Sequence, residues 1–312
     1  MPVPAPNLYP PFNIVRLSHV ELMVTDLGKS RAFYVDTLGL QVTYEDKSEI
    51  HLRALEERGH HCIVLRHAST PCAGHLGFKV FDESDLDRAE AFFKAKDLPI
   101  EWIDRPFQSR TLRTCDVQGV PLELYAHMDR LPPIHQKYAL YKGVKPLRID
   151  HFNCFSPDVD EAVAFYNEIG FRVTEYTEDE VSHRLWAAWT HRKGGVHDIA
   201  FTNGRGPRLH HVAFWVPHPI AIIDLLDLMA TTGYLQNSNA DRDGTASPTP
   251  SFCICAIRMV IALKSIARIT RPSIRTLSRS NGISRTPSAR PCGARRRRGH
   301  GSKKAACSRG LT

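Results

Sequence analysis

The chain contains an internal duplication, and this feature constrains its fold more than any other. Residues 18–46 align with residues 150–179, and the alignment matches His19 with His151 and Asp26 with Asp158. A repeat of this kind decides the architecture before any local prediction does. Each copy has a short alternating stretch, then apolar residues at helical spacing, then stretches rich in Val, Thr and Tyr. These patterns predict a strand, a helix and returning strands, that is, a βαβββ unit in each copy.

A further unit follows each copy. In the first half it runs from HLGFKVF to PLELYAH, whereas in the second half it starts at LHHVAFWV and lacks a closing strand. We therefore predict an α+β fold of paired βαβββ modules. The predicted parts are an N-terminal domain at 14–127, a linker with three prolines at 128–147, an incomplete C-terminal domain at 148–237, and an aberrant tail at 238–312.

The positive net charge of +8 comes from the tail, because residues 238–312 contain 16 of the 41 Lys and Arg residues but only 2 of the 33 Asp and Glu residues. The rest of the chain is net acidic, as in many cytoplasmic enzymes. The sequence has neither a long apolar run nor the layout of a signal peptide, and its eight cysteines are scattered. We therefore expect a cytoplasmic protein with free thiols and no membrane partner.

Two histidines, His151 and His211, occupy the same position in the first strands of successive units, RIDHF and RLHHV. Paired units curl into a half-open barrel, so inward-facing residues of these strands converge. Two imidazoles and one carboxylate with open positions form the ligand set that non-haem Fe(II) uses. We therefore predict a metal site at this pair, with a Glu as third ligand. An alternative set stands at the equivalent positions of the first half, His19, His75 and Glu123.

Three segments, residues 19–40, 148–179 and 189–216, resemble the type I extradiol catechol dioxygenases of the vicinal-oxygen-chelate (glyoxalase/bleomycin-resistance) superfamily. The resemblance covers residues 14–237. It implies two tandem vicinal-oxygen-chelate domains, with Fe(II), or alternatively Mn(II), held in the C-terminal domain by His151 and His211. This implied location favours the C-terminal pair over the N-terminal set. The resemblance also implies a homo-oligomer, a tetramer.

The resemblance assigns roles to three more residues. At matching positions Asn153 lies beside the oxygen site, His197 is a second-sphere acid–base group, and Trp189 is a wall of the substrate pocket. An imidazole normally titrates near neutral pH, so His197 is suited to deliver a proton while the O–O bond breaks. The implied partners are O₂ and a catechol. The branch of the family that is most similar cleaves 3,4-dihydroxyphenylacetate to 5-carboxymethyl-2-hydroxymuconate semialdehyde in aromatic catabolism.

The tail has the features of a frame-shifted sequence. If each codon is built from the third base of one residue and the first two bases of the next, residues 238–303 can be read without a stop. The recovered text resembles the family's ending and contains a D-P-D-G turn followed by H-R-I-E-I-Y. Its Glu, the expected third ligand, lies across the codons of Leu263 and Lys264. We therefore interpret the tail as out of frame and expect it to be disordered.

Three alternatives remain open. The chain is a catalytically dead metal- or ligand-binding remnant if no third ligand is in frame. The basic tail, with its run Arg295–Arg298, suggests a nucleic-acid-binding protein, although no aromatic residue follows Phe252 to stack on bases. Glyoxalase-type chemistry on the same fold is the third alternative. It is less favoured, because Asn153 and His197 match the dioxygenase pattern. We expect no nucleic-acid partner.

Overall fold

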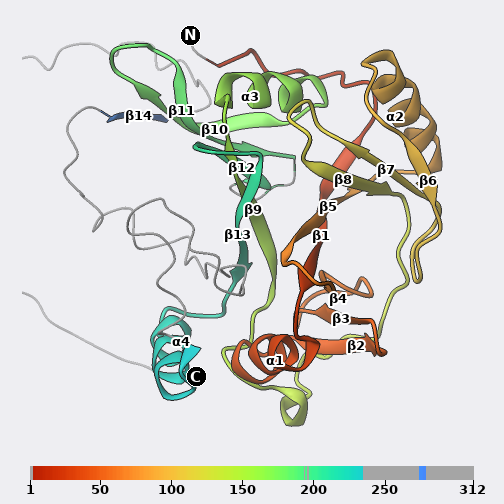
Figure 1. Cartoon of the computed structure of the whole chain (residues 1–312), viewed down its shortest axis with the longest axis vertical. Helices are drawn as coiled ribbons and strands as arrows, with labels where there is room; N and C mark the ends of the chain where they lie inside the picture. The colour runs from red at the N-terminus through yellow and green to blue at the C-terminus, as the bar shows by residue number, and fades with distance from the viewer. Residues whose placement is uncertain (1–2, 193, 195–196, 235–273, 279–312) are drawn as a thin grey trace, which may run out of the picture. The chain divides into compact units, whose positions relative to one another are not determined.

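The computed structural model describes residues 3–192, 194, 197–234 and 274–278 (Figure 1). In the first half it contains two βαβββ units. The first unit comprises β1 (Ile14–Val24), α1 (Leu27–Arg31) continued by the π-helical turn η1 (Ala32–Thr37), β2 (Gln41–Glu45), β3 (Glu49–Arg53) and β4 (Ile63–His67). The second comprises β5 (Cys72–Val80), α2 (Glu83–Ala95), β6 (Glu101–Ile103), β7 (Thr111–Cys115) and β8 (Pro121–Tyr125).

The second half repeats the first unit and begins another. A short 3₁₀ turn, η2 (Tyr138–Leu140), lies in the predicted linker. It is followed by β9 (Arg148–Ser156), α3 (Val159–Glu168), β10 (Arg172–Asp179), β11 (Leu185–His191), β12 (Ile199–Asn203), β13 (Arg208–Trp215), α4 (Ile220–Thr231) and β14 (Ile274–Ser278). Helix α2 packs on β5, β7 and β8, and α3 packs on β10, β11 and β12 (Figure 1). The predicted α+β class and the tandem modules are confirmed.

Both sheets use the same pairing rule. The first has the order β2-β3-β4-β1-β5-β8-β7-β6, and the second has the order β13-β9-β12-β11-β10-β14. Strand β1 pairs parallel with β4 and antiparallel with β5, and β9 pairs parallel with β12 and antiparallel with β13. Each half is therefore joined through the first strands of its successive units.

The tail at 238–312 lies outside the described residues except for Ile274–Ser278. This segment forms β14, which pairs antiparallel with β10 at the edge of the second sheet. For this segment the structure therefore differs from the expectation of disorder. The physical reason is that β10 would otherwise be an edge strand, and its unpaired backbone N–H and C=O groups can pair with another segment. For the other tail residues, and for the domain boundaries, the expectations stay predictions.

The residues matched by the internal repeat have structural roles. Asp26 and Asp158 are the N-caps of α1 and α3, where their side chains accept hydrogen bonds from the backbone N–H of Lys29 and Glu161. Such caps stabilise a helix by about 1 kcal/mol. The matched aromatic pairs are buried in the cores of their halves: Phe33, Tyr34, Phe165 and Tyr166. The repeat therefore preserves the start and the buried face of each first helix.

The strand registers align one row of residues across four neighbouring strands in each half. Across β13, β9, β12 and β11 the row is His211, Asn153, Ala200 and Trp189. Across β5, β1, β4 and β3 the equivalent row is His75, Glu21, Val64 and His51. Directly paired residues point to the same face of a sheet. The predicted site residues on these strands therefore share one face.

Gly39 tests how tightly the predicted linker packs on the first half. It has a φ of +96°, and a Cβ at this position would overlap the carbonyl oxygen of Lys142. We expect Gly39→Ala to lower the free energy of unfolding by about 2 kcal/mol or more, because it adds a left-handed backbone penalty to a steric clash. Urea denaturation measures this change.

The matched control is Gly28→Ala in α1, where the nearest atom to a new Cβ is an oxygen of Asp26 at 3.4 Å. Alanine favours helix, so this variant should be neutral or slightly more stable. Equal losses of stability in both variants would contradict the packing of the linker against Gly39.

Candidate metal centre

Two histidines of the second half meet on the shared face. His151 on β9 is fully buried, His211 on β13 is 5% exposed, and their Nε2 atoms lie 3.1 Å apart. Two nitrogen ligands about 2.1 Å from one ion, at a right angle, are about 3.0 Å apart. The structure therefore brings the predicted pair together at a separation that fits neighbouring ligands of one metal ion.

A carboxylate fixes the ring of His151. Its Nδ1 lies 2.8 Å from Oδ2 of the neighbouring Asp150, which is itself buried. Because an ionised carboxylate accepts but does not donate, Nδ1 carries the proton and Nε2 presents its lone pair to the site. On His211, Nδ1 contacts Nδ1 of His210. His151 thus presents at Nε2 the nitrogen lone pair that a divalent transition metal requires of a ligand.

His197, predicted as an acid–base group, lies beside this pair. Its ring centroid is 4.0 Å from that of His151, and the side chain is 5% exposed. The next residue, Asp198, holds the segment in place because its carboxylate accepts hydrogen bonds from the backbone N–H groups of Leu17 and Arg192. His197 is therefore close enough to the pair to exchange a proton with a molecule bound there.

Asn153 and Trp189 lie on the same face of the sheet as this pair. Asn153 is the direct β-sheet partner of His211, and its Oδ1 accepts a hydrogen bond of 3.2 Å from the hydroxyl of Thr202. Trp189 is partly buried and stands at the other end of the row, three strands from His211. At the usual strand spacing this corresponds to roughly 14 Å between backbones. His211 and Trp189 therefore mark the two ends of the row.

The place of the third ligand follows from the first half. In that half Glu123 on β8 is the strand partner of Gly77 on β5, and Gly77 is in turn the strand partner of His19 on β1. In the second half Ala213 is the partner of His151, so the equivalent Glu should come from a strand next to β13. The residues that would supply this strand fall in the range 235–273, outside the described residues. The predicted missing ligand and frame shift therefore stay predictions.

The alternative set of the first half is also brought together. His19 and His75 have Nε2 atoms 3.1 Å apart, the same separation as in the second half. Glu123, fully buried, places Oε2 at 3.0 Å from Nε2 of His75 and 3.9 Å from that of His19. Its other oxygen, Oε1, accepts hydrogen bonds from Arg105 and Arg113 at 2.5 and 3.0 Å.

The charges of this N-terminal set neutralise one another. Burial raises the pKa of Glu123, but hydrogen bonds with His19, His75 and Arg105 outweigh this and hold it well below its usual range. Burial lowers the pKa of His19 to about 4. Burial also lowers the pKa of His75, but the carboxylates of Glu123 and Glu21 outweigh it and raise that pKa. The set is a buried ion-pair network, and the cavity beside it has a volume of about 10 Å³, too small for a catechol.

The fold and the histidine pair together define the class of the protein. The sequence model of the Glyoxalase/Bleomycin resistance protein/Dioxygenase superfamily matches residues 16–114 and 148–245, and the chain therefore belongs to this superfamily.

Within the superfamily, the chain is homologous to extradiol dioxygenases. It is 26% identical to a metapyrocatechase of Geobacillus stearothermophilus over 78% of each chain. It is 25% identical to a manganese-dependent 2,3-dihydroxybiphenyl 1,2-dioxygenase of Geobacillus genomosp. 3, over 69% of this chain and 73% of that one. These relatives confirm the predicted enzyme class at the level of the family.

A solved structure is more similar. Homoprotocatechuate 2,3-dioxygenase of Brevibacterium fuscum, in complex with 3,4-dihydroxyphenylacetate, is 39% identical with a TM-score of 0.68, over 73% of this chain and 72% of that one. In another structure of that enzyme the matched part spans 64% of its chain.

Sequence reasoning missed some residues that shape these sites. Asp150 precedes His151 and Asp198 follows His197, so a carboxylate next to each of these two histidines was a signal that could have found them. It also missed a group of three histidines in the first half, at positions 51, 60 and 61. Residues 60 and 61 form a His-His doublet, like residues 210 and 211. Such doublets were therefore an available signal.

The ion-pair network predicts a large effect of Glu123→Gln. Because this change removes the carboxylate 2.5 Å from the guanidinium of Arg105, which is 15% exposed, and leaves it only Glu21 at 3.6 Å, we expect the free energy of unfolding to fall by about 3 kcal/mol. Urea denaturation at neutral pH measures the change. The control is Glu101→Gln, since Glu101 is 62% exposed and only 3.5 Å from Arg113, and exposed pairs contribute less than about 1 kcal/mol. A loss at Glu123 no larger than at Glu101 would refute the network.

Proposed function

We propose that the C-terminal half is the catalytic half of an extradiol dioxygenase, which cleaves a catechol next to its diol with O₂. The observation that carries this proposal is the buried pair His151 and His211, 3.1 Å apart at Nε2, with the His197 ring 4.0 Å from His151. This pair would hold Fe(II), or alternatively Mn(II), together with a Glu from outside the described residues. A manganese-dependent relative supports including Mn(II).

In this proposal each residue near the histidine pair has a separate role. His151 and His211 would hold the metal, which would supply Lewis-acid and electron-transfer chemistry toward the catechol oxygens and O₂. Asp150 keeps the proton of His151 on Nδ1, away from the site. His197 holds a proton and delivers it to oxygen as the O–O bond breaks. Asn153 lies beside the oxygen position, and Trp189 forms the far wall of the catechol pocket.

We propose 3,4-dihydroxyphenylacetate as the catechol, cleaved to 5-carboxymethyl-2-hydroxymuconate semialdehyde in aromatic catabolism. The support is the similarity to homoprotocatechuate 2,3-dioxygenase of Brevibacterium fuscum, at 39% identity and bound to that compound. More distant relatives are named for other catechols, namely catechol itself and dihydroxybiphenyl. The small-molecule class of substrate therefore rests on several relatives, and the particular compound on the more similar one.

The competing proposal is a catalytically dead remnant. Among the described residues, two groups contain three side chains close enough to bind one metal ion, and neither group includes His151 or His211. The third ligand decides between the two proposals. Both use the same fold, so only metal binding and turnover separate them.

Two further expectations stay predictions. The tetramer rests on family resemblance, and so does the cytoplasmic location. No helix among the described residues has the length and apolar character needed to cross a membrane.

The decisive experiment compares the chain as given with a version whose reading frame is restored after Asn237. We expect the 312-residue chain to bind Fe(II) weakly and to turn over little catechol, because the two imidazoles lack their carboxylate co-ligand. Loss of even a residue that only supports a metal ligand typically lowers metal affinity or activity by about 10–100-fold. The restored protein should bind iron stoichiometrically and convert 3,4-dihydroxyphenylacetate and O₂ into a yellow semialdehyde. Metal analysis and absorbance measure both.

If the restored protein binds iron yet leaves every catechol tested intact, the proposed function is wrong. If the given chain already holds stoichiometric iron in the C-terminal half and cleaves catechol, the missing-ligand interpretation is wrong instead.

The role of His197 is tested in the restored protein by His197→Asn. We expect kcat to fall by about 10²–10⁴, the usual contribution of a general acid or base, with little change in the Kd for catechol. The control is His183→Asn at an exposed position with a φ of +56°, a conformation that Asn tolerates. A His197→Asn enzyme that loses catechol affinity but keeps its rate would show that His197 binds substrate rather than transferring protons.

A further inference from the structure

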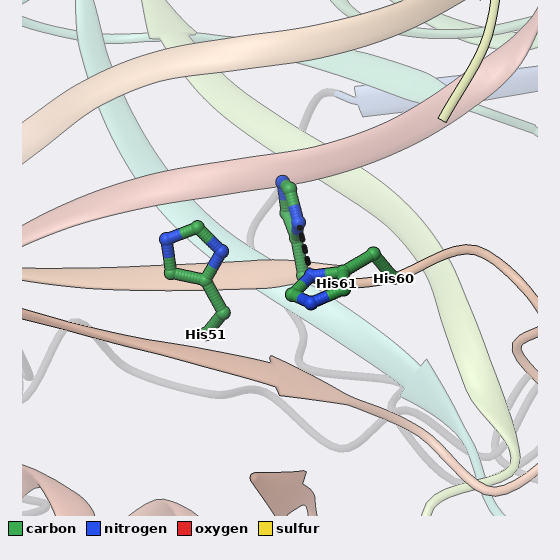
Figure 2. Close-up of side chains that lie close together, drawn as sticks. All are labelled: His51, His60 and His61. Carbon is green, nitrogen blue, oxygen red and sulfur yellow. Dashed lines mark hydrogen bonds between the residues drawn. The ribbon is translucent and has the colours of Figure 1, made fainter. Parts of the chain in front are cut away.

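Three buried histidines gather in the first half, next to the ion-pair network of Glu123. His51 lies on β3, and His60 and His61 precede β4 (Figure 2). The three side chains are 3%, 3% and 4% exposed, and each offers one ring nitrogen within 4.8 Å of the others. Imidazole is the commonest side-chain ligand of transition metals.

Nδ1 of His51 has no hydrogen-bond partner among the described residues. Its Nε2 lies 3.0 Å from Oε1 of Glu49, a carboxylate that accepts the ring proton. Glu49 is in turn paired with Arg66 at 2.7 Å. Nδ1 of His51 therefore carries a lone pair, and it is buried without a hydrogen-bond partner among the described residues. A buried unsatisfied nitrogen is unfavourable, and metal ligation would satisfy it.

His61 presents a second lone pair. Its Nε2 lies 3.1 Å from Oε1 of Gln108, while Nε2 of Gln108 donates to the hydroxyl of Thr111. Gln108 therefore accepts the proton of His61, which leaves Nδ1 of His61 deprotonated. That atom lies 3.2 Å from Nδ1 of His60, the contact drawn as a dashed line in Figure 2. Two nitrogens about 2.0 Å from a tetrahedral ion are about 3.3 Å apart.

The three imidazoles are in the neutral form that metals bind. Burial lowers the pKa of His60 to about 4 and that of His61 well below its usual range, and it lowers the pKa of His51 despite the neighbouring Glu49. A simpler explanation is that His60 donates a proton to His61. This explanation accounts for the 3.2 Å contact, but it leaves Nδ1 of His51 unsatisfied.

The surroundings leave space for one small ligand. His51 and His61 line the same cavity of about 10 Å³ as Glu123, and this volume fits one water molecule as a fourth ligand. The ring of His60 stacks on Phe107 at 3.7 Å. Phe107 and Gln108 belong to the second βαβββ unit, whereas the histidines belong to the first. An ion here would therefore join the two units of the N-terminal half.

We propose that His51, His60 and His61 bind one zinc-like transition-metal ion with a water as fourth ligand, in a structural site separate from the His151 and His211 pair. Three neutral nitrogens without a carboxylate favour Zn(II) or Co(II) over Mn(II) or Mg(II). The strand registers add a comparison between the halves, since His51 is equivalent to Trp189, and His61 precedes β4 as His197 precedes β12. The counterpart of the proposed catechol pocket is thus a metal site.

The test uses the full chain, stripped of metal and titrated with Co(II), whose visible absorption reports its geometry. We expect one equivalent with a tetrahedral spectrum that Zn(II) displaces, and a Tm that rises with Zn(II). His60→Gln should lose this spectrum and weaken binding more than about 100-fold. His60→Cys should keep binding and add a thiolate charge-transfer band, which separates a lost ligand from a misfolded chain.

Controls locate the ion. His67→Gln, at the exposed end of β4, should retain the tetrahedral spectrum, and so should His75→Gln and His211→Gln, which alter the other two histidine groups. Loss of the spectrum in His75→Gln or His211→Gln, with His60→Gln unchanged, would overturn the proposal. So would the absence of any tetrahedral Co(II) band in the original chain. None of these outcomes depends on catechol turnover.

Discussion

The register between the first strands of successive units is the constraint on which both sites depend. Glu21 of β1 faces His75 of β5, and Asn153 of β9 faces His211 of β13. Side chains alternate between the faces of a strand, so a slip by one residue would turn His151 and Asn153 away from their partners. The buried apolar residues on the opposite face, such as Phe152 and Val212, resist such a slip because it would expose them.

The same row of positions supports different chemistry in the two halves. In the first half the row contains Glu21 and His51, and charged partners such as Arg66 and Arg105 surround them. In the second half the equivalent positions are Asn153 and Trp189, which carry no charge. A neutral, apolar wall suits an aromatic ring, whereas dense charge suits an ion-pair network. The duplication therefore provides one scaffold with a charged row in the first half and an uncharged pair, Asn153 and Trp189, at the equivalent positions of the second.

Much of this arrangement could be predicted from the sequence because the repeat itself encodes it. The matching of His19 with His151 placed both on first strands, and the matched Asp26 and Asp158 became helix caps. The convergence of His151 with His211 followed from their equal positions in successive units. The repeat is informative because the first strands of successive units pair with each other, so residues at the same position in two units lie close together in the sheet.

Other features could not be predicted, because they depend on contacts between segments without a repeat relation. The stacking of His60 on Phe107 joins a loop before β4 to a turn before β7, and neither segment has a periodic pattern. The strand β14 pairs with β10 although its residues lie in a stretch with little periodicity. Its pairing depends on an open backbone edge, which the composition of the tail does not reveal.

The two histidine pairs also differ in what holds their rings, so the arrangement of one half does not predict the other in detail. A Cβ at Gly77 would overlap the ring of His19, so that ring lies over the glycine. The equivalent position in the second half is Ala213, whose methyl group occupies this space. The ring of His151 must therefore lie elsewhere, and Asp150 holds it there through Nδ1. Equal Nε2 separations of 3.1 Å thus arise from different ring supports. In the second half the buried carboxylate of Asp150 orients the ring of His151 at 2.8 Å and leaves its Nε2 lone pair for a metal, whereas in the first half the carboxylate of Glu21 lies 3.4 Å from Nδ1 of His75.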